Sequence, residues 1–234
     1  MTRMLVSVRS VDEALAAARG GADFIDLKEP GEGALGGLPV ATIDAIVHAL
    51  RAHGIAGPVS ATIGDLPMHA LPRIRAQVEA VAACGVDYVK VGIERDPEAF
   101  AVLDALAACG WPVVPVFIAD RGLDATLTAH ACALDFPGIM VDTADKLAGS
   151  LFDAVPMAEL QAFVAQVRAS GRMAGAAGAL RVAHMPLLRA LAPDFAGFRS
   201  AVCVADRKTA LCPERLAALA ALLHGEPVVE AAPA

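Results

Sequence analysis

The stretch Phe24-Ile25-Asp26-Leu27-Lys28 is a short β-rich run in which apolar and charged side chains alternate. Because successive side chains of a strand point to opposite faces, Ile25 and Leu27 would face one side of a sheet and Asp26 and Lys28 the other. Alanine-rich stretches with helical spacing precede and follow the run, at 11–19 and 41–53. The segment therefore predicts a strand between two helices, which is the repeating unit of an α/β protein.

This strand–helix alternation recurs eight times along the chain. The predicted strands are 4–8, 24–28, 59–63, 88–91, 113–118, 139–142, 173–177 and 195–198. The predicted helices are 11–19, 41–53, 68–84, 97–109, 125–132, 157–170, 185–191 and 213–224. Eight such units in 234 residues predict a single-domain α/β protein, a (β/α)8 TIM barrel over residues 1–225 with a loose tail at 226–234. A doubly wound open sheet is the alternative, but no GxGxxG follows the first strand.

Composition excludes several classes of function. A net charge of −7 and the absence of a basic run argue against a nucleic-acid partner. The longest uncharged apolar stretch, 105–119, is broken by glycine and proline and is too short to span a membrane. The N-terminus leads straight into the first strand, so we expect a cytoplasmic protein. The five cysteines and six histidines form no metal-ligand spacing, so we expect neither a metal nor a cofactor.

The barrel gives the charged strand residues a common location. In the second, fourth and sixth strands the same alternation turns Asp26, Lys28, Lys90 and Asp142 toward the interior. Alternate strands supply one interior layer of a barrel, so these four side chains would meet at its C-terminal mouth, with Lys146 on the loop behind Asp142.

Lysine is scarce in this chain, with four residues against fifteen arginines. Arginine is always protonated in proteins, so positions that keep lysine are candidates for amine chemistry such as a Schiff base. Simpler interpretations stay open for each residue. Asp26 and Lys28 would also suit a strand-end ion pair, Asp142 a helix cap, and Lys146 a solvated loop, whereas Lys208 reads as an exposed charge.

A phosphate site is predicted in the loops after the last two strands, where barrels commonly bind phosphate. Gly178 follows the seventh strand, and Gly197 and Arg199 lie at the end of the eighth. Glycines let backbone N–H groups approach an anion, and Arg199 shares the inward parity of Gly197. Tight packing of small residues is the other interpretation of these glycines.

Four motifs together resemble the (5-formylfuran-3-yl)methyl phosphate synthase family of methanofuran biosynthesis, also called 4-(hydroxymethyl)-2-furancarboxaldehyde-phosphate synthase. They are Asp26-Leu27-Lys28-Glu29-Pro30 with Gly33-Ala34-Leu35-Gly36, Tyr88-Val89-Lys90-Val91-Gly92, Asp142-Thr143-Ala144-Asp145-Lys146, and Gly197-Phe198-Arg199-Ser200-Ala201-Val202-Cys203. The resemblance runs from about residue 5 to residue 223. It departs from the family pattern at Ala179, where a serine is expected in the loop after the seventh strand.

The resemblance implies a lyase-type synthase that condenses two molecules of glyceraldehyde 3-phosphate with loss of phosphate and water. It implies that Lys28 forms the Schiff base, that Lys90 is the proton acceptor, and that Asp26, Asp142 and Lys146 assist. Two other functions stay open: another Schiff-base aldolase acting on a sugar phosphate, and a non-catalytic barrel that binds a phosphorylated ligand. The sequence leaves open whether the chain forms a homo-oligomer.

Overall fold

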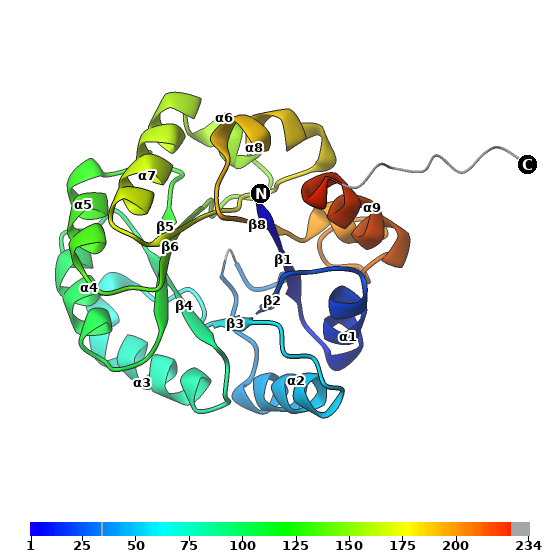
Figure 1. The fold of residues 1–234 in the computed structure, drawn as a ribbon. Coiled ribbons are helices and arrows are strands. Elements are labelled where there is room, and N and C mark those ends of the chain that lie inside the picture. The colour runs from blue at the N-terminus through cyan, green and yellow to red at the C-terminus, as the bar shows by residue number, and fades with distance from the viewer. Residues whose placement is uncertain (34, 226–234) are drawn as a thin grey trace, which may run out of the picture.

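The computed structural model describes residues 1–33 and 35–225, in which eight parallel strands close into a barrel in the order β1 to β8 (Figure 1). The strands are β1 (Arg3–Val8), β2 (Phe24–Leu27), β3 (Val59–Thr62), β4 (Tyr88–Ile93), β5 (Val113–Ile118), β6 (Gly138–Asp142), β7 (Met173–Ala176) and β8 (Phe195–Phe198). The predicted (β/α)8 TIM barrel is confirmed. The predicted tail, 226–234, lies outside the described residues.

Helices surround the barrel and follow the predicted segments closely. They are α1 (Val11–Arg19), α2 (Val40–Ala52), α3 (Leu71–Ala82), α4 (Ala99–Ala107), α5 (Ala125–Ala133), α6 (Leu151–Ala154), α7 (Met157–Ala169), α8 (Met185–Leu191) and α9 (Pro213–His224). The 3-10 turn η1 (Met68–Ala70) forms the start of the helix predicted at 68–84. The single turn α6 and the 3-10 turns η2 (Val182–His184) and η3 (Ser200–Val202) are additions to the predicted pattern. Among the described residues, no helix is long and apolar enough to cross a membrane.

The alternation along the strands separates two apolar cores. Ile25 and Leu27 of β2 belong to the larger core, between the barrel and the helices. Phe24 of the same strand packs instead with Met140 and Phe195 in a smaller core inside the barrel. Burial of the apolar side chains in these two cores is the main source of folding free energy. The strand parity predicted from the sequence is therefore the parity of the structure.

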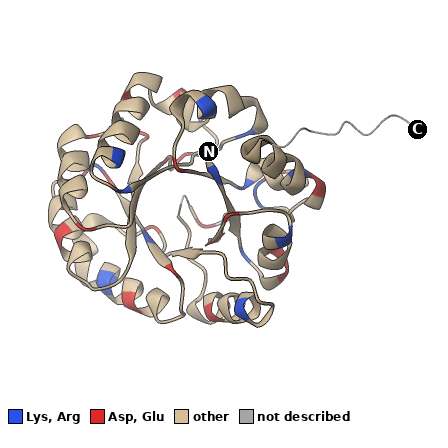
Figure 2. Ribbon diagram, in the orientation of Figure 1, with Lys and Arg blue, Asp and Glu red and all other residues tan. Residues whose placement is uncertain are grey.

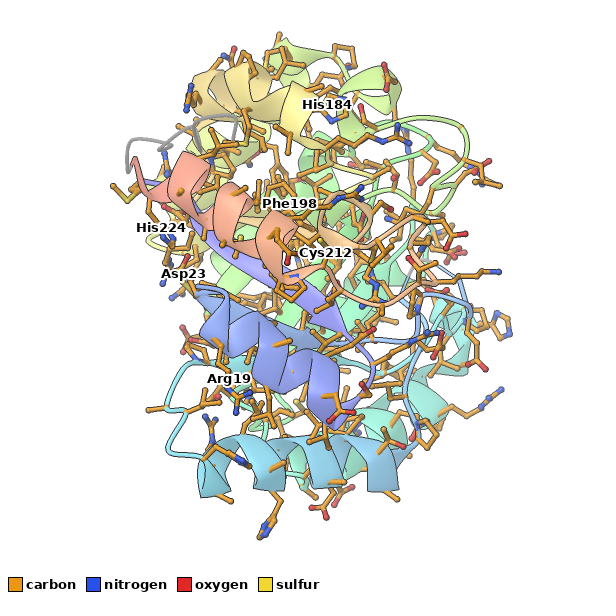
Figure 3. The ribbon with its side chains drawn as sticks, turned by 90° about the vertical axis from the view of Figure 1, so that its right-hand side faces the viewer. Arg19, Asp23, His184, Phe198, Cys212 and His224 are labelled. Atoms are coloured by element: carbon orange, nitrogen blue, oxygen red, sulfur yellow. The ribbon has the colours of Figure 1, made fainter. Side chains whose placement is uncertain are left out.

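Lys, Arg, Asp and Glu residues are distributed over the helices and loops around the barrel (Figure 2). The two ends of the described chain meet beside β1. Near the end of α9, His224 Nε2 lies 2.8 Å from Asp23 Oδ2, and the same carboxylate oxygen accepts the N–H of Met4 at 2.6 Å (Figure 3). The last helix is thus fastened to the first strand at the end of the barrel opposite the carboxyl ends of the strands.

The lower barrel interior has no space for additional atoms at β7. A Cβ added to Gly175 would lie 2.2 Å from Cζ of the Phe195 ring, which is far inside van der Waals contact. We expect Gly175→Ala to lower the free energy of unfolding by about 1–3 kcal/mol, because overpacking a filled core displaces its side chains. Guanidinium unfolding followed by circular dichroism measures the change.

The matched control is Gly57→Ala, at an exposed loop position where an added Cβ has no neighbour closer than 4.0 Å. Its unfolding midpoint should stay close to that of the parent protein. Equal midpoints for the two variants would contradict the close packing described at Gly175.

Candidate active site

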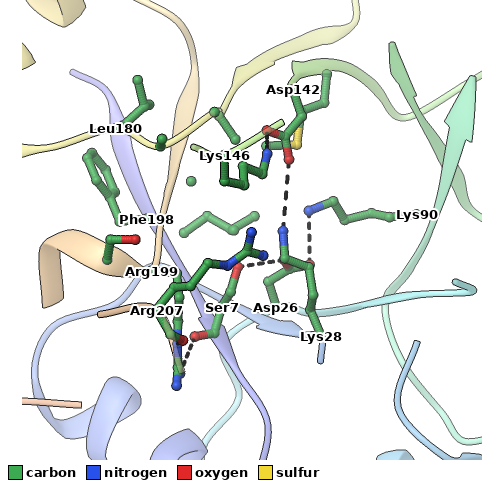
Figure 4. Close-up of a pocket in the computed structure, with 17 residues that line it drawn as sticks. Ser7, Asp26, Lys28, Lys90, Asp142, Lys146, Leu180, Phe198, Arg199 and Arg207 are labelled. Carbon is green, nitrogen blue, oxygen red and sulfur yellow. Dashed lines mark hydrogen bonds and ion pairs between the residues drawn. The ribbon is translucent and has the colours of Figure 1, made fainter. Parts of the chain in front are cut away.

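The carboxyl ends of the strands surround a pocket at one mouth of the barrel (Figure 4). The residues predicted for the site come from β2, β4, β6 and β8 and from the segments that follow β2, β6, β7 and β8. All eight of them line this pocket: Asp26, Lys28, Lys90, Asp142, Lys146, Gly178, Gly197 and Arg199. The structure therefore brings the predicted residues together, while the role of each stays a prediction.

Asp26 is fully buried and accepts three hydrogen bonds from three other strands. Ser7 of β1 donates to Oδ2 at 3.0 Å, and Ser60 of β3 and Lys90 of β4 donate to Oδ1 at 2.7 and 3.0 Å. Burial raises the pKa of the Asp26 carboxyl, but the charges of Lys90 and Lys28 and the hydrogen bonds from Ser60 and Lys90 together lower it by more, so its pKa lies below the usual value. Asp26 is thus an ionised partner that fixes the Lys90 ammonium.

Asp142 forms the second buried carboxylate of the pocket, at 2% exposure. Its Oδ1 accepts hydrogen bonds from Lys146 Nζ and from the backbone N–H of Thr143, and its Oδ2 lies 3.9 Å from Lys28 Nζ. Burial raises the pKa of this carboxyl, yet the charges of Lys146 and Lys28 together with the hydrogen bonds from Lys146 and Thr143 hold the pKa below its usual value. Asp142 is therefore shared between two amines.

Lys28 differs from the other two lysines of the pocket. Its side chain is buried, its nearest carboxylate oxygen is the Asp142 atom at 3.9 Å, and among the described residues no hydrogen bond to its Nζ is found. Burial lowers the pKa of the Lys28 amine to about 8; Asp142 and Asp26 raise the pKa, whereas Lys146 and Lys90 lower it further. At this pKa about a tenth of the amine is uncharged at pH 7.

The ion pairs differ from the simplest interpretation of the sequence. The close partner of Asp26 is Lys90, on β4, and the carboxylate nearest to Lys28 is Asp142, on β6, so the pairs join different strands rather than neighbours on one strand. The Lys146 side chain is only 10% exposed, so the residue is not a solvated loop charge. Lys208 is exposed, as its sequence context indicates.

The residues predicted to bind phosphate lie after β7 and at the end of β8. Gly178 has φ +119°, and an added Cβ would lie 2.9 Å from Thr143 Oγ1; the following Ala179 also has a positive φ, +46°. A Cβ at Gly197 would lie 3.0 Å from Cβ of Ala177. Tight packing thus accounts for both glycines, and both also face the pocket.

Arg199 lines the pocket, but its guanidinium is bonded entirely to protein. Two donors reach the Glu13 carboxylate at 2.6 and 3.0 Å, and the other three reach the carbonyls of Ser7, Arg207 and Thr209 at 3.1, 2.8 and 2.8 Å. All five N–H groups are occupied. Direct phosphate binding by Arg199 stays a prediction that would require it to exchange these partners.

Three further residues of the pocket region escaped the sequence analysis. Ser7 and Ser60 bind Asp26, and Arg207 reaches the pocket from the loop after β8. Strand parity turns both serines inward, which was a usable signal. Arg207 lies in an irregular segment, so strand alternation could not predict the direction of its side chain. The described residues contain no group of three or more His, Cys, Asp and Glu side chains arranged to hold a metal ion.

Three known proteins are similar to this chain over most of its length. (5-Formylfuran-3-yl)methyl phosphate synthase of Archaeoglobus fulgidus is 33% identical over 237 aligned residues, covering 95% of this chain and 100% of that protein. The synthase of Methanopyrus kandleri is 36% identical over 216 residues, covering 86% and 89%. A Methylorubrum extorquens protein described as a candidate for the same synthase is 38% identical over 231 residues, covering 98% and 95%.

Solved structures share the fold at low identity. Phosphoribosyl anthranilate isomerase from Thermus thermophilus superposes with a TM-score of 0.64 at 20% identity, covering 96% of this chain and 99% of that one. Dihydrodipicolinate synthase from Bacillus clausii gives 0.66 at 12%, covering 96% and 75%. These likenesses concern the barrel alone. The 4-HFC-P synthase family model, by contrast, matches residues 4–220, and with the three relatives above it shows that this chain belongs to that family.

Proposed function

We propose that this protein condenses two molecules of glyceraldehyde 3-phosphate into (5-formylfuran-3-yl)methyl phosphate through a Schiff base on Lys28. Atom balance requires the loss of one phosphate and two waters. Family membership and the names of the relatives support this product, which would serve the synthesis of a methanofuran-type one-carbon carrier. The proposal makes the protein a phosphate-eliminating lyase.

The environment of Lys28 is the observation that carries this proposal. Its amine is buried, free of hydrogen bonds among the described residues, and has its pKa lowered to about 8. An uncharged amine is the form that attacks an aldehyde. Lys90 and Lys146, in contrast, are each hydrogen-bonded to a carboxylate, which holds them in place.

Glyceraldehyde 3-phosphate suits the chemistry of such an amine. Addition of Lys28 Nζ to the aldehyde carbon C1, followed by loss of water, gives an iminium. The iminium withdraws electrons, so a base can remove the proton on C2 and leave an enamine. The enamine nitrogen can then return its electron pair and expel the phosphate from C3, or the enamine carbon can attack the aldehyde of the second triose.

The paired groups around Lys28 would move the protons. Lys90 is the proposed proton acceptor and would act as the uncharged amine. Asp26, whose Oδ1 lies 3.0 Å from Lys90 Nζ, would stabilise the ammonium that forms when Lys90 takes the proton from C2. Asp142 and Lys146 lie next to Lys28 and would assist formation and hydrolysis of the iminium. Each such group typically contributes about 10²–10⁴ in rate.

Borohydride trapping tests the covalent step. With glyceraldehyde 3-phosphate present, reduction should add the substrate mass less one oxygen atom to the peptide that contains Lys28, because iminium formation loses water and reduction adds two hydrogens. Lys28→Arg should abolish both the adduct and the furan product. Mass spectrometry and furan absorbance are the measurements. Adduct without furan would favour another Schiff-base aldolase, and reversible binding without adduct would favour a non-catalytic barrel.

Lys90→Arg separates charge from proton transfer. Arginine keeps the positive charge beside Asp26 but stays protonated, so kcat should fall by about 10²–10⁴-fold while the Lys28 adduct remains trappable. Lys208→Arg, at an exposed position, is the matched control and should keep full activity. Normal turnover by Lys90→Arg would mean that this residue supplies only charge.

Adduct formation should depend on pH through Lys28. Below a pKa of about 8 the uncharged fraction falls about tenfold per pH unit, so the initial trapping rate should rise with pH and level off above about 8. Because the Asp142 charge raises this pKa, Asp142→Asn should move the inflection to lower pH. An unchanged inflection would show that Asp142 does not act on Lys28.

A further inference from the structure

The segment between β8 and α9 places a second arginine over the pocket. Arg207 is half-buried and lines the pocket together with Arg199, which lies eight positions earlier in the sequence. Figure 4 shows the Arg207 side chain extending toward Lys28, whereas the Arg199 guanidinium turns to the backbone of Ser7. The Arg207 guanidinium therefore lies on the Lys28 side of the pocket, whereas the Arg199 guanidinium is turned toward β1.

Arg207 keeps most of its donors available. Among the described residues its one hydrogen bond runs from Nη2 to the carbonyl of Gly33, in the segment after β2, at the long distance of 3.3 Å. Four of the five guanidinium N–H groups thus have no protein acceptor there. A planar fork of free donors at a pocket wall matches the oxygens of a phosphate group.

Arg199 in turn determines where Arg207 lies. Its Nε donates to the Arg207 carbonyl at 2.8 Å and its Nη2 to the Thr209 carbonyl at 2.8 Å, on either side of Lys208. The bidentate pair with Glu13 of α1 holds the Arg199 guanidinium in place. Arg199 thereby connects the barrel wall to the backbone that carries Arg207.

The charge balance of the pocket favours an anion on the Arg207 side. Five cationic side chains line the pocket against two carboxylates, Asp26 and Asp142. Both carboxylates are bonded to lysines, and Arg199 is neutralised by Glu13. The charge of Arg207 has no ion-pair partner within 4 Å among the described residues, in a protein whose net charge is −7.

We propose that Arg207 binds the phosphate group of a triose phosphate in this pocket, and that Arg199 is a positioning residue that holds Arg207 in place. The inference rests on the proposed function for its substrate, but phosphate binding can be measured without turnover. It assigns the anion contact to a residue outside the predicted site.

The test compares Arg207→Ala with Lys208→Ala, which removes the neighbouring exposed cation of the same segment. Arg207→Ala should raise KM for glyceraldehyde 3-phosphate by about 10–100-fold, because it removes a charge-assisted hydrogen bond to the phosphate. The dissociation constant of inorganic phosphate, measured by calorimetry, should rise similarly, while trapping of unphosphorylated glyceraldehyde on Lys28 stays unchanged. Lys208→Ala should alter none of these.

Phosphate affinity and KM within twofold of the parent protein in Arg207→Ala would overturn the assignment. This result differs from failure of the proposed function, which would show as a parent protein that forms no adduct or furan yet still binds phosphate through Arg207.

A double-mutant cycle distinguishes the two arginines. Arg199→Lys should raise KM in the parent background, but in the Arg207→Ala background it should add little, because Arg199 acts through Arg207. Circular dichroism and thermal unfolding establish that the variants are folded; if Arg199→Lys does not fold, the phosphate titration of Arg207→Ala still decides the main assignment. A further KM rise equal to that in the parent background would show that Arg199 contacts phosphate itself.

Discussion

The buried carboxylate of Asp26 is the interaction on which the rest of the site depends. An ionised carboxylate without solvent needs compensating donors, and β1, β3 and β4 each provide one. Because Lys90 occupies this carboxylate, Lys28 is left with the more distant oxygen of Asp142. The same contact fixes Lys90 and leaves Lys28 without a close carboxylate, which fits their proposed roles as proton acceptor and nucleophile.

The barrel interior contains an apolar layer and a polar layer. Aliphatic and aromatic side chains fill the lower part, and a layer of serines, carboxylates and amines fills the part below the mouth. Buried ion pairs of this kind contribute little net stability, since desolvation offsets their attraction. Their retention in a chain that uses lysine only four times is therefore better explained by chemistry than by folding. The apolar layer supplies the stability that the polar layer lacks.

Strand parity made most of the fold and much of the candidate site predictable. It placed Asp26, Lys90 and Asp142 on the inner wall because their strands alternate regularly, and it identified the apolar residues on the outer faces. Parity also predicted Arg199 at the mouth. It could not predict that the Arg199 guanidinium pairs with the carboxylate of Glu13 on α1. The pairing of charges across strands depends on three-dimensional spacing. The position of Arg207 could not be predicted, because its segment between β8 and α9 has neither the two-residue period of a strand nor the 3.6-residue period of a helix.

The bond between Arg199 and Glu13 also bears on how the molecule is assembled. These residues are 186 positions apart, and they join the first helix to the last strand beside the β1–β8 seam. Contacts of such sequence separation form only after nearly all of the chain has left the ribosome, and they tend to be slow. A nascent chain that ends before β8 already contains the three lysines of the pocket but lacks the Arg199–Glu13 pair. The pocket at the mouth becomes complete only when the barrel closes.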